Sequence, residues 1–273
     1  EALDKDIKVI ESLGVEIKCL TTVGKDVTLE EIRDEYDAVF LGTGFSKGRS
    51  TGVEGVDSEG VIMAIPLLEK IRDYLRQGDG EKPPVTDSVI VIGGGNVAMD
   101  AARSVARIQK MERNHIDVKV TSLESMEEMP ADLEEILEGK EEGIKYFPSR
   151  GPKEVLLKDG KIYGLKTIAC TRVFDDDSRF NPRFDESDLS TIEGTMIIEA
   201  IGQAPDYDFL PVEIKGEIQF IRGRILVNEK GQTALAWLFA GGDIVNGPDI
   251  IHGVADGHRA ATGIDEFLAG VKK

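Results

Sequence analysis

A glycine-rich turn between an apolar strand and a helix constrains the fold of this chain more than any other feature. Residues 88–92 read Ser-Val-Ile-Val-Ile, a run typical of a parallel strand that is buried on both faces. A G-x-G-x-x-A pattern follows at once, and the spacing of apolar residues predicts a helix from about Asn96 to Lys110. Strand, glycine turn and helix in this order form the context that a dinucleotide-binding turn requires. The sequence therefore predicts an α/β fold.

Each position of the turn has its own physical role. The first glycine allows the sharp turn, the second lets a pyrophosphate approach the backbone, and the small last residue lets the helix pack closely on the strand. The N-terminus of the helix adds free N–H groups and the positive end of its dipole. The alternative is a glycine-rich turn without a ligand. The candidate cofactor-binding residues here are Gly93, Gly94, Gly95, Asn96, Val97 and Ala98.

The end of the next predicted strand, 118–123, distinguishes the two nicotinamide dinucleotides. The 2′-phosphate of NADP needs a cation there, whereas the ribose diol of NAD suits a carboxylate. Glu124 follows this strand, and no Lys or Arg occurs between Thr121 and Lys140. We therefore expect Glu124 to contact the ribose, so that NAD(H) is favoured over NADP(H). Even if the segment is only a solvated acidic turn, NADP(H) lacks a cationic partner in it.

Two further strand ends carry small residues and suggest a second nucleotide site. Thr43 and Gly44 follow an apolar strand at 38–41, and Gly242 and Asp243 follow another at 235–240. Small residues permit close backbone approach, and the aspartate can hold a ribityl or ribose hydroxyl. Asp249 is predicted to cap the last helix, whose N-terminus would stabilise the negative edge of a reduced flavin. We add the first residues of that helix, Ile250 and Ile251, to the candidate contacts.

Composition excludes several classes of function. The net charge of −18 argues against nucleic acid or an anionic membrane as partner, and no apolar run approaches the ~20 residues of a membrane span. The two cysteines, Cys19 and Cys170, form no C-x-x-C for a redox dithiol or zinc, and we expect both to be small core residues. No secretory leader is evident, so a cytoplasmic location is expected.

Taken together, these motifs resemble a known family. The resemblance rests on residues 36–44, 91–103, 127–131, 199–205, 240–244 and 257–261. The chain is similar to the small (beta) subunit of glutamate synthase and its relatives, flavoprotein oxidoreductases with two dinucleotide-binding domains. The resemblance implies a Rossmann-like α/β fold with an NAD(P)-binding domain at 85–205. It is inserted into an incomplete FAD-binding domain formed by 1–84 and 206–273. Gly202 and Gln203, in one of the shared segments, become candidate cofactor contacts.

The same resemblance implies the chemistry. Hydride would pass from NAD(P)H to N5 of FAD, and electrons would continue through iron–sulfur clusters to a partner subunit or domain, with no side chain acting as acid or base. The family's iron–sulfur region and FAD fingerprint turn are not found in the sequence, and residues 1–13 already read as an amphipathic helix. We therefore expect a piece of a longer protein that is inactive alone and does not retain FAD. The family's Arg pair is replaced by Leu123-Glu124.

Two alternatives stay open: an NADPH glutamate synthase small subunit proper, and a flavin-free nucleotide-binding or docking module. Three further segments have local patterns of their own. Residues 15–20 alternate like a strand, residues 78–84 read as a linker between domains, and residues 175–188 read as a charged loop after a β-meander.

Overall fold

The computed structural model describes residues 2–77, 81–247 and 249–271. The chain divides into two compact units. Unit 1 combines Glu1–Phe45 with Pro205–Lys273, and unit 2 is the continuous segment Ser46–Ala204.

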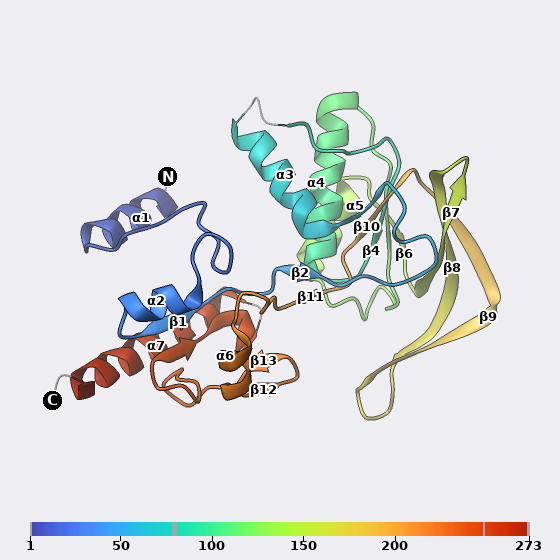
Figure 1. The fold of residues 1–273 in the computed structure, drawn as a ribbon. Helices are drawn as coiled ribbons and strands as arrows, with labels where there is room; N and C mark the ends of the chain where they lie inside the picture. The colour runs from blue at the N-terminus through green and yellow to red at the C-terminus, as the bar shows by residue number, and fades with distance from the viewer. Residues whose placement is uncertain (1, 78–80, 248, 272–273) are drawn as a thin grey trace. The chain divides into compact units, whose positions relative to one another are not determined.

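Unit 2 is built on a parallel five-stranded sheet with the order β3-β10-β4-β5-β6 (Figure 1). Its strands are β3 (Val61–Met63), β10 (Met196–Glu199), β4 (Val89–Ile92), β5 (Val118–Thr121) and β6 (Lys145–Phe147). Every residue of β4, β5 and β10 is buried. The continuous apolar run at 88–92 is thus the central strand that its composition predicted.

The two faces of β4 pack against different layers. Val89 and Val91 join a cluster with buried residues of α3 (Ala64–Gln77) and α4 (Asn96–Arg113). Ile90 and Ile92 pack instead against a three-stranded antiparallel sheet. Figure 1 shows the helices on one side of the parallel sheet and the antiparallel strands on the other. With α5 (Leu133–Glu141) packed on α4, unit 2 is a layered α/β domain.

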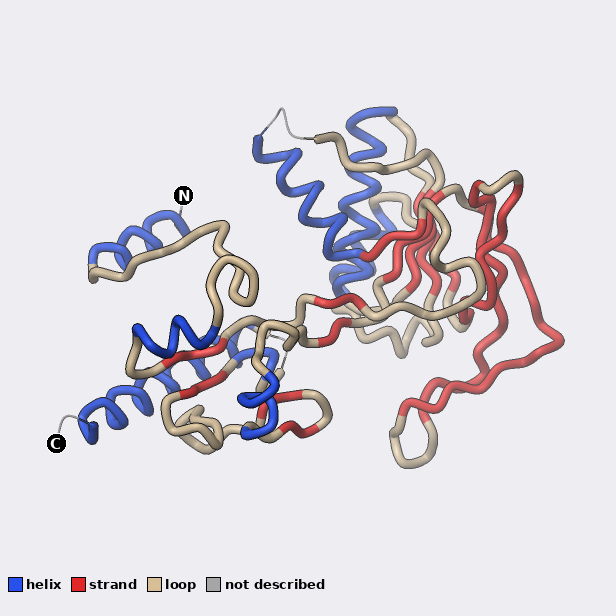
Figure 2. The backbone as a smooth tube through the Cα atoms, viewed as in Figure 1, coloured by secondary structure: helices blue, strands red, loops and turns tan. Residues whose placement is uncertain are grey.

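The antiparallel sheet consists of β7 (Arg150–Lys158), β8 (Lys161–Phe174) and β9 (Phe180–Glu193). The turn between β7 and β8 is Asp159-Gly160, where both residues have positive φ, as the meander prediction required. Figure 2 shows β9 as a long strand beside β8, so the prediction of a charged loop at 175–188 was wrong for most of its length. An edge strand keeps its outer side in water, so charged side chains do not prevent it from pairing with β8.

The compact unit begins earlier in the chain than the predicted boundary at residue 85, because residues 46–84 belong to unit 2. β3 pairs in parallel with β10, and α3 packs on α4. A short antiparallel pair, β2 (Lys47–Gly48) with β11 (Gln203–Ala204), joins the two ends of the unit. Of the predicted linker, residues 78–80 lie outside the described residues.

Unit 1 contains the parallel pair β1 (Val39–Leu41) and β14 (Leu238–Ala240). Its other elements are α1 (Ala2–Ser12), α2 (Leu29–Glu35), α6 (Val212–Glu217), β12 (Phe220–Ile221), β13 (Arg224–Ile225), the short 3₁₀ helix η1 (Gly242–Ile244) and α7 (Ile250–Val271). The Thr28 and Glu31 side chains form the capping box that starts α2.

The strand predicted at 15–20 is absent among the described residues, since this segment is exposed and pairs with no strand. Cys19 lies in it and is exposed, so only Cys170 is the buried cysteine that was expected. Alternation alone does not make a strand where no neighbouring edge accepts its hydrogen bonds. No helix in the described part of the chain is long and apolar enough to span a bilayer.

Candidate functional site

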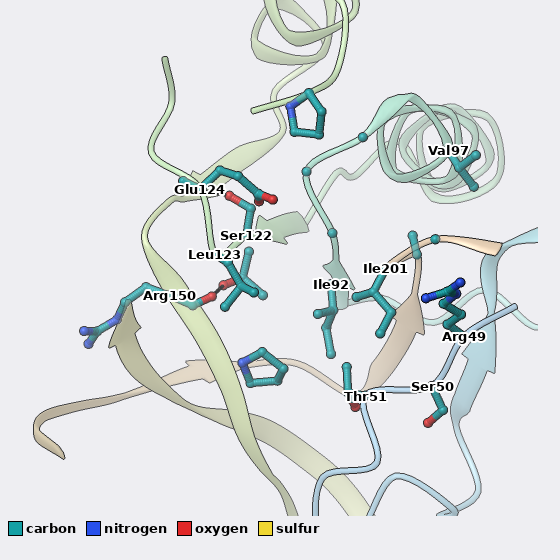
Figure 3. A pocket seen from close by; sticks show the side chains of 18 of the residues that line it. Arg49, Ser50, Thr51, Ile92, Val97, Ser122, Leu123, Glu124, Arg150 and Ile201 are labelled. Atoms are coloured by element: carbon teal, nitrogen blue, oxygen red, sulfur yellow. Dashed lines mark hydrogen bonds between the residues drawn. The ribbon is translucent and has the colours of Figure 1, made fainter. Parts of the chain in front are cut away.

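A pocket of about 690 Å³ opens in unit 2 at the carboxyl ends of β4, β5 and β10 (Figure 3). Its walls come from the glycine turn, residues 121–124, residues 200–202, the segment 49–53, and the sheet β7–β9. Open parallel sheets bind their ligands at this edge, and the volume is in the usual range for a small-molecule site. The pocket is therefore the candidate site of the unit.

Gly93 makes the turn possible. Its φ of +144° is unfavourable for any other residue, and a β-carbon there would lie 2.3 Å from the carbonyl oxygen of Ala200. Its N–H donates to the carbonyl of Thr121 at 2.9 Å. The turn is thus held tightly between β5 and the end of β10.

Gly95 is the N-cap residue of α4, and no side chain caps the helix there. The atom nearest to a β-carbon added on Gly95 would be 4.0 Å away, so the space in front of it is open. The N–H groups of Asn96 and Val97 lie in the first turn of the helix and have no intrahelical acceptor. Val97 lines the pocket beside the glycine turn. Open space, free donors and the positive end of the helix dipole together fit a pyrophosphate.

Two predicted residues have structural roles in the same turn. Ala98 is fully buried, and its Cβ would lie 3.3 Å from a β-carbon on Gly93, so helix and strand pack as closely as the motif implies. The Asn96 side chain donates to Asp132 Oδ2 at 3.0 Å and accepts from the Asp132 N–H at 2.8 Å. The Asn96 side chain therefore fixes the start of α5. The group of Asn96 that could bind a ligand is its backbone N–H.

Glu124 follows β5 at a distance of three residues, and its side chain lies beside the glycine turn. A β-carbon on Gly94 would be 2.9 Å from Glu124 Oε2. The carbonyl of Glu124 accepts the Ser149 N–H at 2.8 Å and the Ser122 hydroxyl at 2.9 Å, which fixes the loop after β5. Figure 3 shows the Glu124 side chain above Ser122, next to the strand that leads into α4.

Arg150, which the sequence analysis missed, also lines the pocket. It begins β7, and its N–H donates to the Ser122 carbonyl at 2.7 Å. Its guanidinium binds Asp188 Oδ1 at 2.7 Å and Ser190 Oγ at 3.0 Å. The charge is thus paired with a carboxylate of β9. Parallel strands end at one edge of a sheet, so residues that follow β6 are expected near those that follow β5.

A second missed group lies at the other end of the pocket. Arg49 Nε donates to the carbonyl of Gln203 at 3.1 Å, and the Arg49 N–H donates to the carbonyl of Gly202 at 3.0 Å. The N–H and hydroxyl of Thr51 both bind Glu199 Oε1, each at 2.6 Å. Glu199 is 2% exposed and its Oε2 is buried without a hydrogen-bond partner in the described chain. Gly202 lines the pocket, whereas Gln203 is outside its lining and pairs with Gly48.

In unit 1 the parallel pairing of β1 and β14 brings the two predicted strand ends together. Leu41 faces Ala240 in the register, and a β-carbon on Gly44 would lie 3.6 Å from Asp243 Oδ2. Thr43-Gly44 and Gly242-Asp243 are therefore neighbours, as a shared binding edge requires. The Gly242 N–H donates to the buried Asp256 of α7 at 2.9 Å, which anchors η1.

Asp249 caps α7 as predicted, because its Oδ1 accepts the His252 N–H at 2.8 Å. Oδ2 contacts the His252 imidazole at 2.6 Å. These bonds, the backbone one foremost, lower the pKa of Asp249. Ile250 and Ile251 begin the helix with side chains that are 84% and 80% exposed in this chain.

A family model described as pyridine nucleotide-disulphide oxidoreductase matches residues 3–257. The chain belongs to the pyridine nucleotide-disulphide oxidoreductase family. Among curated members, it is 34% identical to the NADP(+)-dependent formate dehydrogenase subunit beta of Moorella thermoacetica, over 98% of this chain and 37% of that protein. It is 30% identical to the glutamate synthase [NADPH] small chain of Escherichia coli strain K12, over 98% of this chain and 58% of that protein.

The resemblance to glutamate synthase small subunits and related oxidoreductases is thus confirmed, although the chain spans only 37% and 58% of these relatives. The names of these two relatives include NADP(+) and NADPH. The comparison therefore favours NADP(H) and does not support the preference for NAD(H) that was predicted from Glu124.

Solved structures confirm the fold class. Mycobacterium tuberculosis FprA in complex with NADPH aligns with a TM-score of 0.71 at 16% identity, over 92% of this chain and 68% of FprA. The thioredoxin reductase of T. acidophilum aligns with a TM-score of 0.61 at 20% identity, over 86% of this chain and 66% of that one. The α/β fold is therefore of the FAD/NAD(P)-binding, Rossmann-like type.

Proposed function

We propose that the chain is the nucleotide-binding part of an NAD(P)H-dependent flavin oxidoreductase. In it, unit 2 binds the nicotinamide dinucleotide and unit 1 contributes to the site of FAD. The observation that carries this proposal is the glycine turn. Gly95 leaves open space in front of the free N–H groups at the start of α4, at the edge of a 690 Å³ pocket.

The described residues fit a dinucleotide along the whole pocket. The pyrophosphate would be bound by backbone N–H groups of Gly95, Asn96 and Val97, which are free because the helix starts there. The adenosine ribose would be bound by the carboxylate of Glu124. The nicotinamide half would then extend toward Arg49 and Gly202, at the opposite end of the pocket.

Unit 1 has residues that suit a flavin dinucleotide. Asp243 is held beside Gly44 by the parallel strand pair, where its carboxylate can accept a bond from a ribityl or ribose hydroxyl. The N-terminus of α7 supplies positive dipole for the flavin edge. FAD, when bound, supplies a two-electron acceptor for the hydride and releases electrons singly. The chain's own residues position the cofactors.

For the choice of nucleotide, we propose that this chain favours NAD(H). Glu124, which lies over the glycine turn, carries a negative charge. The positive charge of Arg150 is paired with Asp188, so neither residue offers a free positive charge to a 2′-phosphate. The names of the relatives favour the second candidate, an NADPH-dependent small subunit. Because the relatives are beta or small subunits, we further propose an electron-accepting partner subunit, with iron–sulfur clusters outside this chain.

Calorimetric titration of the full chain with NADH and NADPH tests the proposal. We expect saturable binding of NADH in unmodified protein and none in Gly95→Val, whose new side chain fills the phosphate space. Absence of binding of both nucleotides to the folded, unmodified chain would refute the proposal. Tighter binding of NADPH would instead support the second candidate.

A further inference from the structure

Two aromatic side chains of β9 line the pocket in unit 2. Phe180 and Phe184 belong to the strand that the sequence analysis interpreted as a loop, and both contribute to the pocket wall. They are 65% and 39% exposed, so a large part of each side chain is accessible in the chain as it stands. Exposed aromatic rings in a concave, mostly apolar site are typical surfaces for a flat ligand group.

Phe184 is placed by close packing against the end of the parallel sheet. A β-carbon on Gly151 would lie 2.8 Å from Phe184 Cε1 and 3.0 Å from Leu123 Cδ2. The ring therefore lies directly on the backbone of Gly151, beside Leu123. Since Leu123 precedes Glu124, the ring is at the end of the pocket where the adenosine ribose would be bound.

Arg150 ties β9 to this end of the sheet. Its backbone is fixed at the sheet edge, where its carbonyl accepts the Thr121 hydroxyl at 3.0 Å. Its side chain is 17% exposed and reaches across to Asp188 and Ser190 of β9. Such a charge-assisted, partly buried bond holds two strands in a defined position. Arg150 thereby keeps the strand that carries Phe184 over the pocket.

We propose that Phe184 is the surface on which the adenine ring of the dinucleotide stacks, with Arg150 as a positioning residue. The inference rests on the proposed function and deepens it, because it assigns recognition of the base to the antiparallel sheet and recognition of the ribose to Glu124. Every base has a π face, so stacking on an aromatic ring favours the adenosine moiety without regard to the 2′ substituent. NADH, NADPH and ADP-ribose share this contact.

Binding of ADP-ribose to the full chain tests the role of the ring. We expect Phe184→Leu, which keeps an apolar side chain but loses the π face, to weaken ADP-ribose binding about fivefold or more. The matched control is Tyr163→Leu, an aromatic residue of β8 that is 47% exposed and lies outside the pocket, which should change affinity less than twofold. ADP-ribose binding within twofold of the unmodified chain in Phe184→Leu would overturn the inference and leave the proposed function intact.

A fluorescence measurement separates stacking from a merely structural role. Trp237, the one tryptophan in the sequence, is replaced by Phe, and Phe184→Trp is then added. Saturating ADP-ribose, which has no nicotinamide, should quench the new tryptophan, whereas Tyr163→Trp in the same background should stay unchanged. Unchanged emission of Phe184→Trp in protein that binds ADP-ribose would contradict stacking. Failure of the unmodified chain to bind ADP-ribose, NADH or NADPH would refute the proposed function itself.

Discussion

The carboxylate of Glu124 lies over the backbone of Gly94, so close that a β-carbon on that glycine would be 2.9 Å from Glu124 Oε2. The end of β5 and the glycine turn therefore meet across one corner of the pocket. This contact connects the residue that we propose to select between nucleotides with the turn that would bind the pyrophosphate. We therefore expect the choice between NAD(H) and NADP(H) to depend on the charge at this corner.

The first prediction concerns that choice. NADH should bind at least about tenfold more tightly than NADPH, because a 2′-phosphate near Glu124 costs on the order of a few kcal/mol before screening by salt. The double change Leu123→Arg with Glu124→Arg should reverse the order by removing the repulsion and adding a phosphate partner. Calorimetry with both nucleotides measures the ratio.

Glu127→Arg serves as the control for this experiment, since Glu127 is exposed and lies outside the pocket lining. It introduces a positive charge near the same strand end but outside the pocket lining, and it should leave the ratio almost unaltered. Equal affinities of the unmodified chain for NADH and NADPH would show that Glu124 does not contact the ribose.

The second prediction separates two glycines of one turn. Gly95→Val should fold normally and lose nucleotide binding, because Gly95 has ordinary φ and open space that the pyrophosphate would need. Gly93→Ala should lower the free energy of unfolding by about 3 kcal/mol or more, since its methyl group meets the Ala200 carbonyl at a positive φ. Urea unfolding and NADH titration of both variants distinguish the roles. A stable Gly93→Ala that still binds NADH would contradict the packing described here.

The third prediction concerns the contact between α4 and α5. Arg103 is 11% exposed and forms ion pairs with Glu135, Glu138 and Glu142. Arg103→Met should reduce the free energy of unfolding by about 2–4 kcal/mol, because it leaves these carboxylates without their shared cation. Arg107→Met removes a 62% exposed partner of Glu142 and should cost less than about 1 kcal/mol. Similar decreases in the free energy of unfolding of the two variants would argue against Arg103 as the main ion-pair link between α4 and α5.

The fourth prediction concerns pH. Burial opposes ionisation of Asp117, but hydrogen bonds from Lys119 and Ser88 outweigh it and bring its pKa down to about 2. A lowered pKa in the folded state gives stability that is complete above the unfolded pKa of about 3.9 and lost as the pH falls through 2. Asp117→Asn should therefore flatten the decline of the free energy of unfolding between about pH 5 and 2, by roughly 1–2 kcal/mol.

Urea unfolding at several pH values in this range provides the measurement for Asp117. Asp159→Asn, at the exposed turn between β7 and β8, is the control and should keep the slope of the unmodified chain. An unchanged slope in Asp117→Asn would show that the bonds to Lys119 and Ser88 do not persist in solution.

The sequence alone determined the features that depend on local contacts. The turn at Gly93–Gly95 and the cap at Asp249 are recognisable because each uses bonds between residues close in the chain. The burial of β4 was also predictable, since only a strand covered on both faces tolerates a continuous apolar run.

Tertiary structure decided what depends on pairing over long distances. A charged segment became β9 because β8 offered it an edge, whereas residues 15–20 pair with no strand of the described chain. Arg150 joined the pocket only because β5 and β6 end side by side. A local sequence pattern indicates the structural propensity of a segment. The rest of the fold supplies the groups that form hydrogen bonds with its backbone and ion pairs with its charges.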